Sequence, residues 1–234
     1  MRIGLLECDV IAEKLRPIAG GFPEMFGGLL AGPLPDAELI SYDLYGGHVP
    51  ASPKDCDAWV CTGSRASAYD DEEWIANLSG FVREIHDQGS PFVGICFGHQ
   101  VLARALGGTV EKAPGGWGAG VHQLDVVVEP RWMDPALVRP NLLFMHQDQV
   151  TSLPDGATLL ARTDHCPIAM FELGSMVGLQ AHPEFTPGFV AALLDDRIER
   201  IGAAGVEAAH RSLATPTDEA VVGQWLSGVL SGIR

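Results

Sequence analysis

The sequence predicts an α/β protein with a mostly parallel central sheet and an added antiparallel section. Up to about residue 108, short apolar runs alternate with longer amphipathic segments, which is typical of parallel strands joined by helices. From residue 109 to 182 the apolar runs become shorter and richer in turns, which indicates antiparallel strands. Glycine and proline are dispersed along all 234 residues without a low-complexity linker or repeat, so we expect a single domain over residues 1–234.

The first part of the chain contains runs that predict four buried strands and two helices. The strands are expected at residues 2–6, 38–44, 58–61 and 91–95. One helix is expected over residues 71–88, where Trp74, Leu78 and Phe81 have helical spacing. A second is expected from about residue 98 to 106, ended by the two glycines that follow.

Residues 17–35 are rich in proline and predict a loop. This loop either frames the mouth of an active site or is an ordinary long connection, and the sequence leaves both open.

The second part of the chain is expected to complete the same sheet in a more antiparallel arrangement. Its candidate strands are residues 109–112, 121–128, 142–144, 159–162, 168–171 and 176–180. Two helices, at residues 187–201 and 218–230, are expected to close the chain.

The composition argues against several classes of protein. Apolar residues make up 47% of the chain and charged residues 19%, which is unlike a disordered protein. Fifteen basic and 30 acidic residues give a net charge of −15 without a basic patch, so we expect no binding to nucleic acid or to a membrane surface. No apolar run approaches the roughly 18 residues of a membrane span, and the N-terminus lacks the apolar stretch of a signal peptide.

The five cysteines are an odd number and include no C-x-x-C pair, which argues against a disulfide framework or a four-thiolate zinc site. Free thiols fit a reducing compartment, so we expect a cytoplasmic protein. His146, Asp148, His122 and His165 do not have the spacing of a zinc site, and no metal is expected.

Residues 94–98, G-I-C-F-G, have the pattern of a nucleophile elbow. The pattern follows an apolar strand and precedes a helix, with Cys96 in the position of the nucleophile. A sharp turn would strain Cys96 and leave no room for side chains at Gly94 and Gly98. The start of the helix would favour the thiolate and would aim the amide of Phe97 at a developing oxyanion.

His182 and Glu184 lie two residues apart at the end of an apolar run, with Pro183 between them. Alternate residues of an extended chain share a face, so both side chains point the same way. A carboxylate placed beside an imidazole can hold one tautomer for work on a nearby thiol. By itself this pattern is as compatible with a solvated proline turn, but together with the elbow it indicates a catalytic pair.

Taken together, these motifs resemble the class I glutamine amidotransferases over about residues 1–190. The elbow continues as His99-Gln100, and the H-P-E segment follows it in the order typical of the family. Residues 62–64, T-G-S, look like the loop that supplies an oxyanion amide, and residues 146–150, H-Q-D-Q-V, look like a segment of the GMP-synthase-like branch. Trp117 lies in a stretch that is similar to the one preceding a strand in that branch. The resemblance implies a flavodoxin-like three-layer sandwich.

The resemblance also implies a reaction and a role for each residue. Cys96 would attack the side-chain amide of glutamine, and His182, oriented by Glu184, would move the proton. The amides of Gly63 and Phe97 would form the oxyanion hole. Residues expected to contact the substrate are Gln100, Gln147 and Asp148. No metal or organic cofactor is required.

Several functions stay open at this point. The leading hypothesis is release of ammonia from glutamine; because the chain has no P-loop, a separate synthase subunit would accept that ammonia. The same residues would also serve a γ-glutamyl peptidase that acts on γ-glutamyl conjugates. Two further alternatives are a non-catalytic thiol sensor on this scaffold and an obligate subunit that is silent until a synthase docks.

Overall fold

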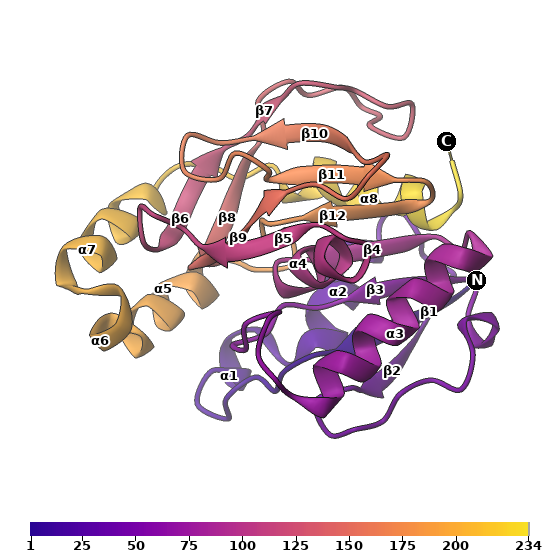
Figure 1. The fold of residues 1–234 in the computed structure, drawn as a ribbon. Helices are drawn as coiled ribbons and strands as arrows, with labels where there is room; N and C mark the ends of the chain where they lie inside the picture. The colour runs from indigo at the N-terminus through magenta and orange to yellow at the C-terminus, as the bar shows by residue number, and fades with distance from the viewer. Residues whose placement is uncertain (234) are drawn as a thin grey trace.

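An eight-stranded sheet forms the middle layer of the structure, a computed structural model that describes residues 1–233 (Figure 1). Its strands, in spatial order, are β2 (Glu38–Asp43), β1 (Arg2–Glu7), β3 (Ala58–Cys61), β4 (Phe92–Ile95), β12 (Met176–Leu179), β11 (Met170–Leu173), β10 (Thr158–Arg162) and β7 (Asp125–Val126). The strands from β2 to β12 run parallel, and β11, β10 and β7 are each antiparallel to their neighbours. The predicted mostly parallel sheet with an antiparallel section is confirmed.

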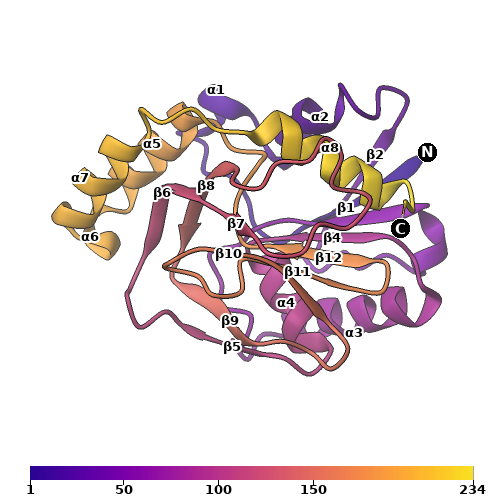
Figure 2. The same cartoon turned by 90° about the horizontal axis from the view of Figure 1, so that it is seen from above.

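Helices cover both faces of the sheet (Figure 2). One face carries α3 (Glu73–Gln88) and α4 (Phe97–Ala105), and the other carries α2 (Phe22–Leu30) and α8 (Glu219–Leu230). The remaining helical segments are α1 (Arg16–Ala19), α5 (Pro187–Asp196), α6 (Ile198–Ile201), α7 (Ala203–Ser212) and the 3₁₀ turn η1 (Pro53–Asp55). Together these layers make the three-layer α/β/α sandwich that the sequence implied.

Strand residues alternate between the two helical layers. In β3, Trp59 packs on the side of α3, whereas Val60 packs on the side of α2. Both are almost fully buried, as expected for a central strand covered on both faces. The continuous apolar runs of β3 and β4 in the sequence have this origin.

Two ladders lie outside the main sheet, contrary to the expectation that residues 109–182 complete it. One pairs β5 (Thr109–Lys112) with β9 (Asp148–Ser152), and the other pairs β6 (Gly118–Gln123) with β8 (Asn141–His146). The expected strand over residues 121–128 divides into β6 and β7 at Leu124, whose side chain is buried. β9 was not expected from the sequence.

The prediction of a loop over residues 17–35 is wrong, because the segment contains the end of α1 and all of α2. Pro23 lies in the first turn of α2, where its missing N–H costs nothing. Phe22, Met25 and Phe26 form the buried face of the helix, and they pack against the sheet.

The single helix expected over residues 187–201 is also divided. Arg197 has φ −107° and ψ 13°, which ends α5 and begins α6. α7 follows at once and packs on β6, although the sequence did not predict it. None of the helices within residues 1–233 is long and apolar enough to cross a membrane.

Candidate active site

Cys96 lies at the carboxyl end of β4, in the turn that leads directly into α4. Its φ of 51° and ψ of −99° are strained for a side-chain-bearing residue, and Cys96 is the one non-glycine residue within 1–233 with a positive φ. The residue is 6% exposed. The turn therefore presents the thiol at the end of the sheet, next to the first turn of α4.

The two glycines of the elbow are required by close backbone contacts. A Cβ on Gly94 would lie 2.5 Å from the carbonyl oxygen of Gly98, and a Cβ on Gly98 would lie 2.5 Å from the carbonyl oxygen of Cys61. Neither backbone atom can move without opening the turn. The sequence pattern thus has a steric cause, as we expected from the residues alone.

His182 and Glu184 form a buried pair next to this turn. His182 Nδ1 and Glu184 Oε1 are 2.7 Å apart, and the two side chains are 4% and 0% exposed. The ring of Phe185 stacks on the imidazole, with 4.0 Å between centroids and 4° between planes. The backbone N–H of His182 donates to Leu143 in β8 at 2.8 Å. The imidazole is consequently held by a carboxylate, an aromatic ring and a neighbouring strand.

The charge of His182 depends on its two acidic neighbours. Burial alone would lower the pKa of this imidazole, but the negative charges of Glu184 and Cys96 beside it outweigh burial and raise the pKa to about 10. Imidazolium next to a thiolate is the state that supports nucleophilic attack by sulfur.

The T-G-S loop lies against both groups. A Cβ on Gly63 would be 2.9 Å from His182 Cε1 and 3.7 Å from Cys96 Cβ, so only glycine lets the loop approach this closely. Thr62 fixes the loop on both sides: its hydroxyl accepts from the amide of Cys8 at 3.0 Å, and its carbonyl accepts from the amide of Gly98 at 3.2 Å.

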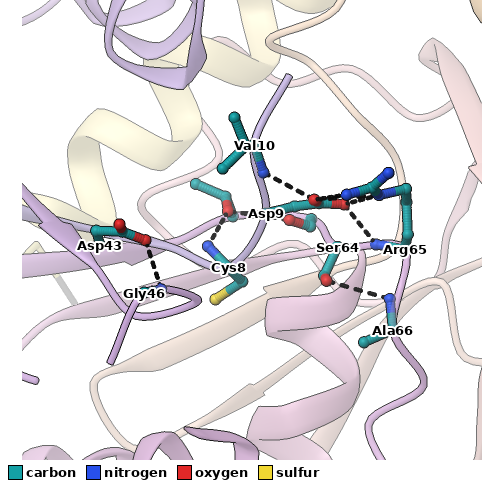
Figure 3. A network of polar contacts seen from close by, with 10 residues as sticks. Cys8, Asp9, Val10, Asp43, Gly46, Ser64, Arg65 and Ala66 are labelled. Atoms are coloured by element: carbon teal, nitrogen blue, oxygen red, sulfur yellow. Dashed lines mark hydrogen bonds and ion pairs between the residues drawn. The ribbon is translucent and has the colours of Figure 1, made fainter. Parts of the chain in front are cut away.

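An ion pair braces the same loop from outside (Figure 3). Asp9 accepts hydrogen bonds from the backbone N–H of Arg65 at 2.9 Å and from the Arg65 guanidinium at 2.8 Å. It also accepts from the backbone N–H of Val10 at 2.7 Å. Asp9 is 8% exposed, so its carboxylate ties the end of β1 to the loop after β3. The sequence analysis missed this pair, since the two residues are 56 positions apart.

Gln100, Gln147 and Asp148 line a cavity of about 100 Å³ that Cys96 lines as well. The Gln100 side chain donates to the carbonyl of Asp148 at 2.8 Å and to the Gln180 side chain at 3.1 Å. The Asp148 carboxylate accepts from the hydroxyls of Tyr69 at 3.1 Å and of Ser67. The structure therefore brings together the residues expected near the substrate, and it holds Asp148 through two hydroxyls that the sequence did not single out.

A second cavity of about 220 Å³ is also lined by Cys96. Gly63 and His182 line this larger cavity, together with several apolar side chains and Arg197. Cys96 lines both cavities, of which the smaller is mainly polar and the larger is more apolar.

The remaining histidines are not arranged as a metal site. Within residues 1–233, no three His, Cys, Asp or Glu side chains are placed to hold a metal ion together. Burial lowers the pKa of His146 to about 3 and that of His99 to about 4, so both are neutral. His99 packs on Phe171 with 5.0 Å between ring centroids.

Comparison with known proteins places the chain in a family. The model of class-I glutamine amidotransferases matches residues 56–199. Gamma-glutamyl peptidase 4 of Arabidopsis thaliana is 30% identical over 205 residues, which cover 83% of this chain and 78% of that protein. Gamma-glutamyl peptidase 5 is 34% identical over 145 residues, but there the alignment spans 59% of this chain and only 58% of the relative.

Two other comparisons extend the picture. The GMP synthase of Corynebacterium jeikeium is 32% identical over 63% of this chain and 27% of its own length. A glutamine amidotransferase from Thermotoga maritima has the same fold, with a TM-score of 0.76 and 20% identity over 98% of both chains. Because the family model matches more than half of the chain, the protein belongs to the class-I glutamine amidotransferase family.

Proposed function

We propose that this protein hydrolyses γ-glutamyl amide bonds through a covalent intermediate on Cys96. The observation that carries the proposal is the buried pair of His182 and Glu184, 2.7 Å apart, beside a cysteine held at φ 51°. A structural cysteine needs neither a strained backbone nor a charged base next to it. The same pair argues against a non-catalytic thiol sensor, which has no use for a base.

The reaction proceeds in two halves. The Cys96 thiolate attacks the γ-carbonyl carbon, and the amides of Gly63 and Phe97 stabilise the oxyanion. The C–N bond breaks as His182 gives its proton to the leaving amine. His182 then takes a proton from water, whose oxygen attacks the thioester and releases glutamate and the thiolate. Glu184 orients His182 throughout and balances its charge whenever the imidazole is protonated.

The smaller cavity is proposed to hold the amino-acid end of the γ-glutamyl group. Asp148 supplies a carboxylate for the substrate's ammonium group, held in place by Tyr69 and Ser67. Gln147 lines the same cavity, while both donors of the Gln100 amide are already used within the protein. Gln100 therefore contributes mainly by fixing the backbone of Asp148.

Glutamine is the substrate that the family suggests, with ammonia as the leaving group. The GMP synthase relatives are much longer than the aligned segment, so a separate synthase subunit that accepts the ammonia belongs to this proposal. We propose further that residues 1–234 act as one domain, in the cytoplasm. The five cysteines are all free in the structure, which suits a reducing compartment.

A γ-glutamyl peptidase is the second candidate, favoured by one specific observation. Four relatives among the curated proteins bear the name gamma-glutamyl peptidase, and they match at 24–34% identity. The chemistry at Cys96 would be the same for both candidates, and only the leaving group would differ.

Glutamate release by the purified protein tests the proposal. We expect turnover of glutamine or of a γ-glutamyl dipeptide, and a loss of at least about 10⁴-fold in the Cys96→Ala variant, because no other group can form the thioester. Cys56→Ala is the matched control, since Cys56 is buried at a site remote from both cavities. Equal activity in the wild type and the Cys96→Ala variant would contradict the assignment.

A further inference from the structure

The larger cavity beside Cys96 has much more space than ammonia requires. Its volume is about 220 Å³, whereas roughly 10–15 Å³ of such space holds a water molecule, which is similar in size to ammonia. A site that releases only ammonia has no need for this space on the chain itself.

The position of the cavity identifies it as the leaving-group side. His182, the proton donor to the leaving amine under the proposed function, lines this cavity and not the smaller one. Gln147 and Asp148, by contrast, line only the smaller cavity. With the acyl carbon at the Cys96 sulfur, the glutamyl end and the amine end of a substrate would therefore extend into different cavities.

Apolar side chains form part of the wall of the larger cavity. They include Leu15, Phe22, Phe185, Phe189 and Leu193, all at most 7% exposed in the folded protein. Such walls favour a hydrocarbon side chain over water. The affinity of the ligand rises roughly tenfold for each 1.4 kcal/mol that this burial contributes.

Arg197 lines the cavity and has no acidic partner among the residues that the structure describes. Asp9 pairs with Arg65 and Asp196 pairs with Lys14, so the two acidic groups at the cavity are neutralised. Arg197 is half-buried, and within residues 1–233 no carboxylate oxygen lies within 4 Å of its guanidinium. A half-buried arginine without a partner is well suited to a carboxylate that arrives with the ligand.

Arg197 lines both cavities, but the smaller one has a cation of its own. Lys112 lines the smaller cavity alone, and it can meet the α-carboxylate of the glutamyl end. Two more arginines line both cavities: Arg65 is paired with Asp9, and Arg200 lies over the ring of Trp117 at 5.3 Å. Arg197 is thus left for a second carboxylate, on the leaving group.

We infer that the preferred substrates are γ-glutamyl amides of amino acids that have an apolar side chain and a free carboxylate. The side chain occupies the larger cavity and the carboxylate pairs with Arg197. The inference rests on the proposed function, because it assigns the leaving group of that reaction. Hydrolysis then yields glutamate and the free apolar amino acid, with water supplying the hydroxyl to the acyl carbon and the proton to the amine.

Binding to the Cys96→Ala protein tests the cavity separately from the chemistry. Isothermal titration would compare γ-glutamylleucine with glutamine, with γ-glutamylglycine, which lacks the side chain, and with γ-glutamylleucinamide, which lacks the carboxylate. We expect γ-glutamylleucine to bind about tenfold or more tightly than each of the other three.

Two variants locate the contacts. Ala12 is exposed and lines the larger cavity, so Ala12→Phe should fill it without disturbing the core. Ala12→Phe and Arg197→Gln are each made in the Cys96→Ala protein. Both should weaken the binding of γ-glutamylleucine by about tenfold or more and leave the affinity for glutamine within about twofold of its value in the Cys96→Ala protein. The matched controls are Ala51→Phe and Arg162→Gln, exposed positions remote from both cavities.

Each outcome decides one of the two claims. Two results would overturn the leaving-group assignment: equal affinity for γ-glutamylleucine and glutamine, or an equal loss of affinity for both ligands in Arg197→Gln. The cavity would then be a face for a synthase subunit or a site for the glutamyl carboxylate. Tight, Arg197-dependent binding together with no Cys96-dependent turnover by the wild type would instead overturn the proposed function and leave the cavity assignment in place.

Discussion

His182 combines two properties that usually exclude each other, burial and a positive charge. Its side chain is 4% exposed, yet the carboxylate of Glu184 and the thiolate of Cys96 raise its pKa to about 10. The stacked ring of Phe185 covers one face and keeps water from screening these charges. The protonated state of one imidazole therefore depends on two negative groups.

Removing one of those charges should change the pH dependence of catalysis. In Glu184→Gln the desolvation of His182 persists while its carboxylate partner is lost, so the pKa of the imidazole should fall. We expect kcat/KM to drop about 10²- to 10⁴-fold and the alkaline limb of the pH profile to move toward neutral pH. A pH profile of glutamate release measures both effects, with Glu111→Gln on exposed β5 as the control. A reduced rate with an unmoved alkaline limb would contradict this account of the charge.

The turn between β4 and α4 is the element that fixes the geometry of the nucleophile. Its two glycines contact each other's backbone and that of Cys61, and nothing flexible lies between them. The sequence predicted this element because its strand, turn and helix are consecutive in the chain. The close backbone contacts of the turn also require glycine at two fixed positions, which can be recognised in the sequence.

A pair of glycine substitutions tests the steric argument. Gly98→Ala would bring a Cβ to 2.5 Å from a backbone oxygen, so we expect a loss of about 1–3 kcal/mol in the free energy of unfolding. Gly80 lies within α3, and a Cβ added there would have no neighbouring atom within 4 Å, so Gly80→Ala should stabilise by about 0.5–1 kcal/mol. Urea unfolding of both variants measures the two signs, and a neutral Gly98→Ala would refute the close contact.

Elements whose signals conflict were harder to predict. In α2, Pro23 and two glycines favoured a loop, although Phe22, Met25 and Phe26 already had helical spacing. The break between the two helices at Arg197 has no signal in the sequence, because it depends on how α5 and α6 pack. Cys96 and the His182–Glu184 pair could be identified from the sequence because each lies in a local motif. Contacts between distant segments were missed because they leave no such motif.

The whole molecule carries 15 more acidic than basic residues, and this excess should show in its stability. Ion pairs such as Arg211 with Glu207 and Arg139 with Asp125 join exposed side chains and contribute little. Self-repulsion of the remaining negative charge opposes the compact state, and salt screens it.

Added salt should therefore stabilise the fold. Between 0.05 and 0.5 M NaCl we expect the Tm to rise by about 2–4 °C, which corresponds to about 1 kcal/mol for a chain of this size. Differential scanning calorimetry measures the change, and KCl should give the same rise because screening does not depend on the cation. A Tm that falls with salt would show that attractive ion pairs dominate.

Three neighbouring strands, β3, β4 and β12, deliver Gly63, Cys96 and His182 to one edge of the sheet. Their backbone hydrogen bonds lie in the centre of the fold, where amides exchange with solvent only when the whole structure opens. The spacing of the three groups is accordingly as durable as the native state itself. On heating, the activity should survive until the sheet melts and then vanish in the same step.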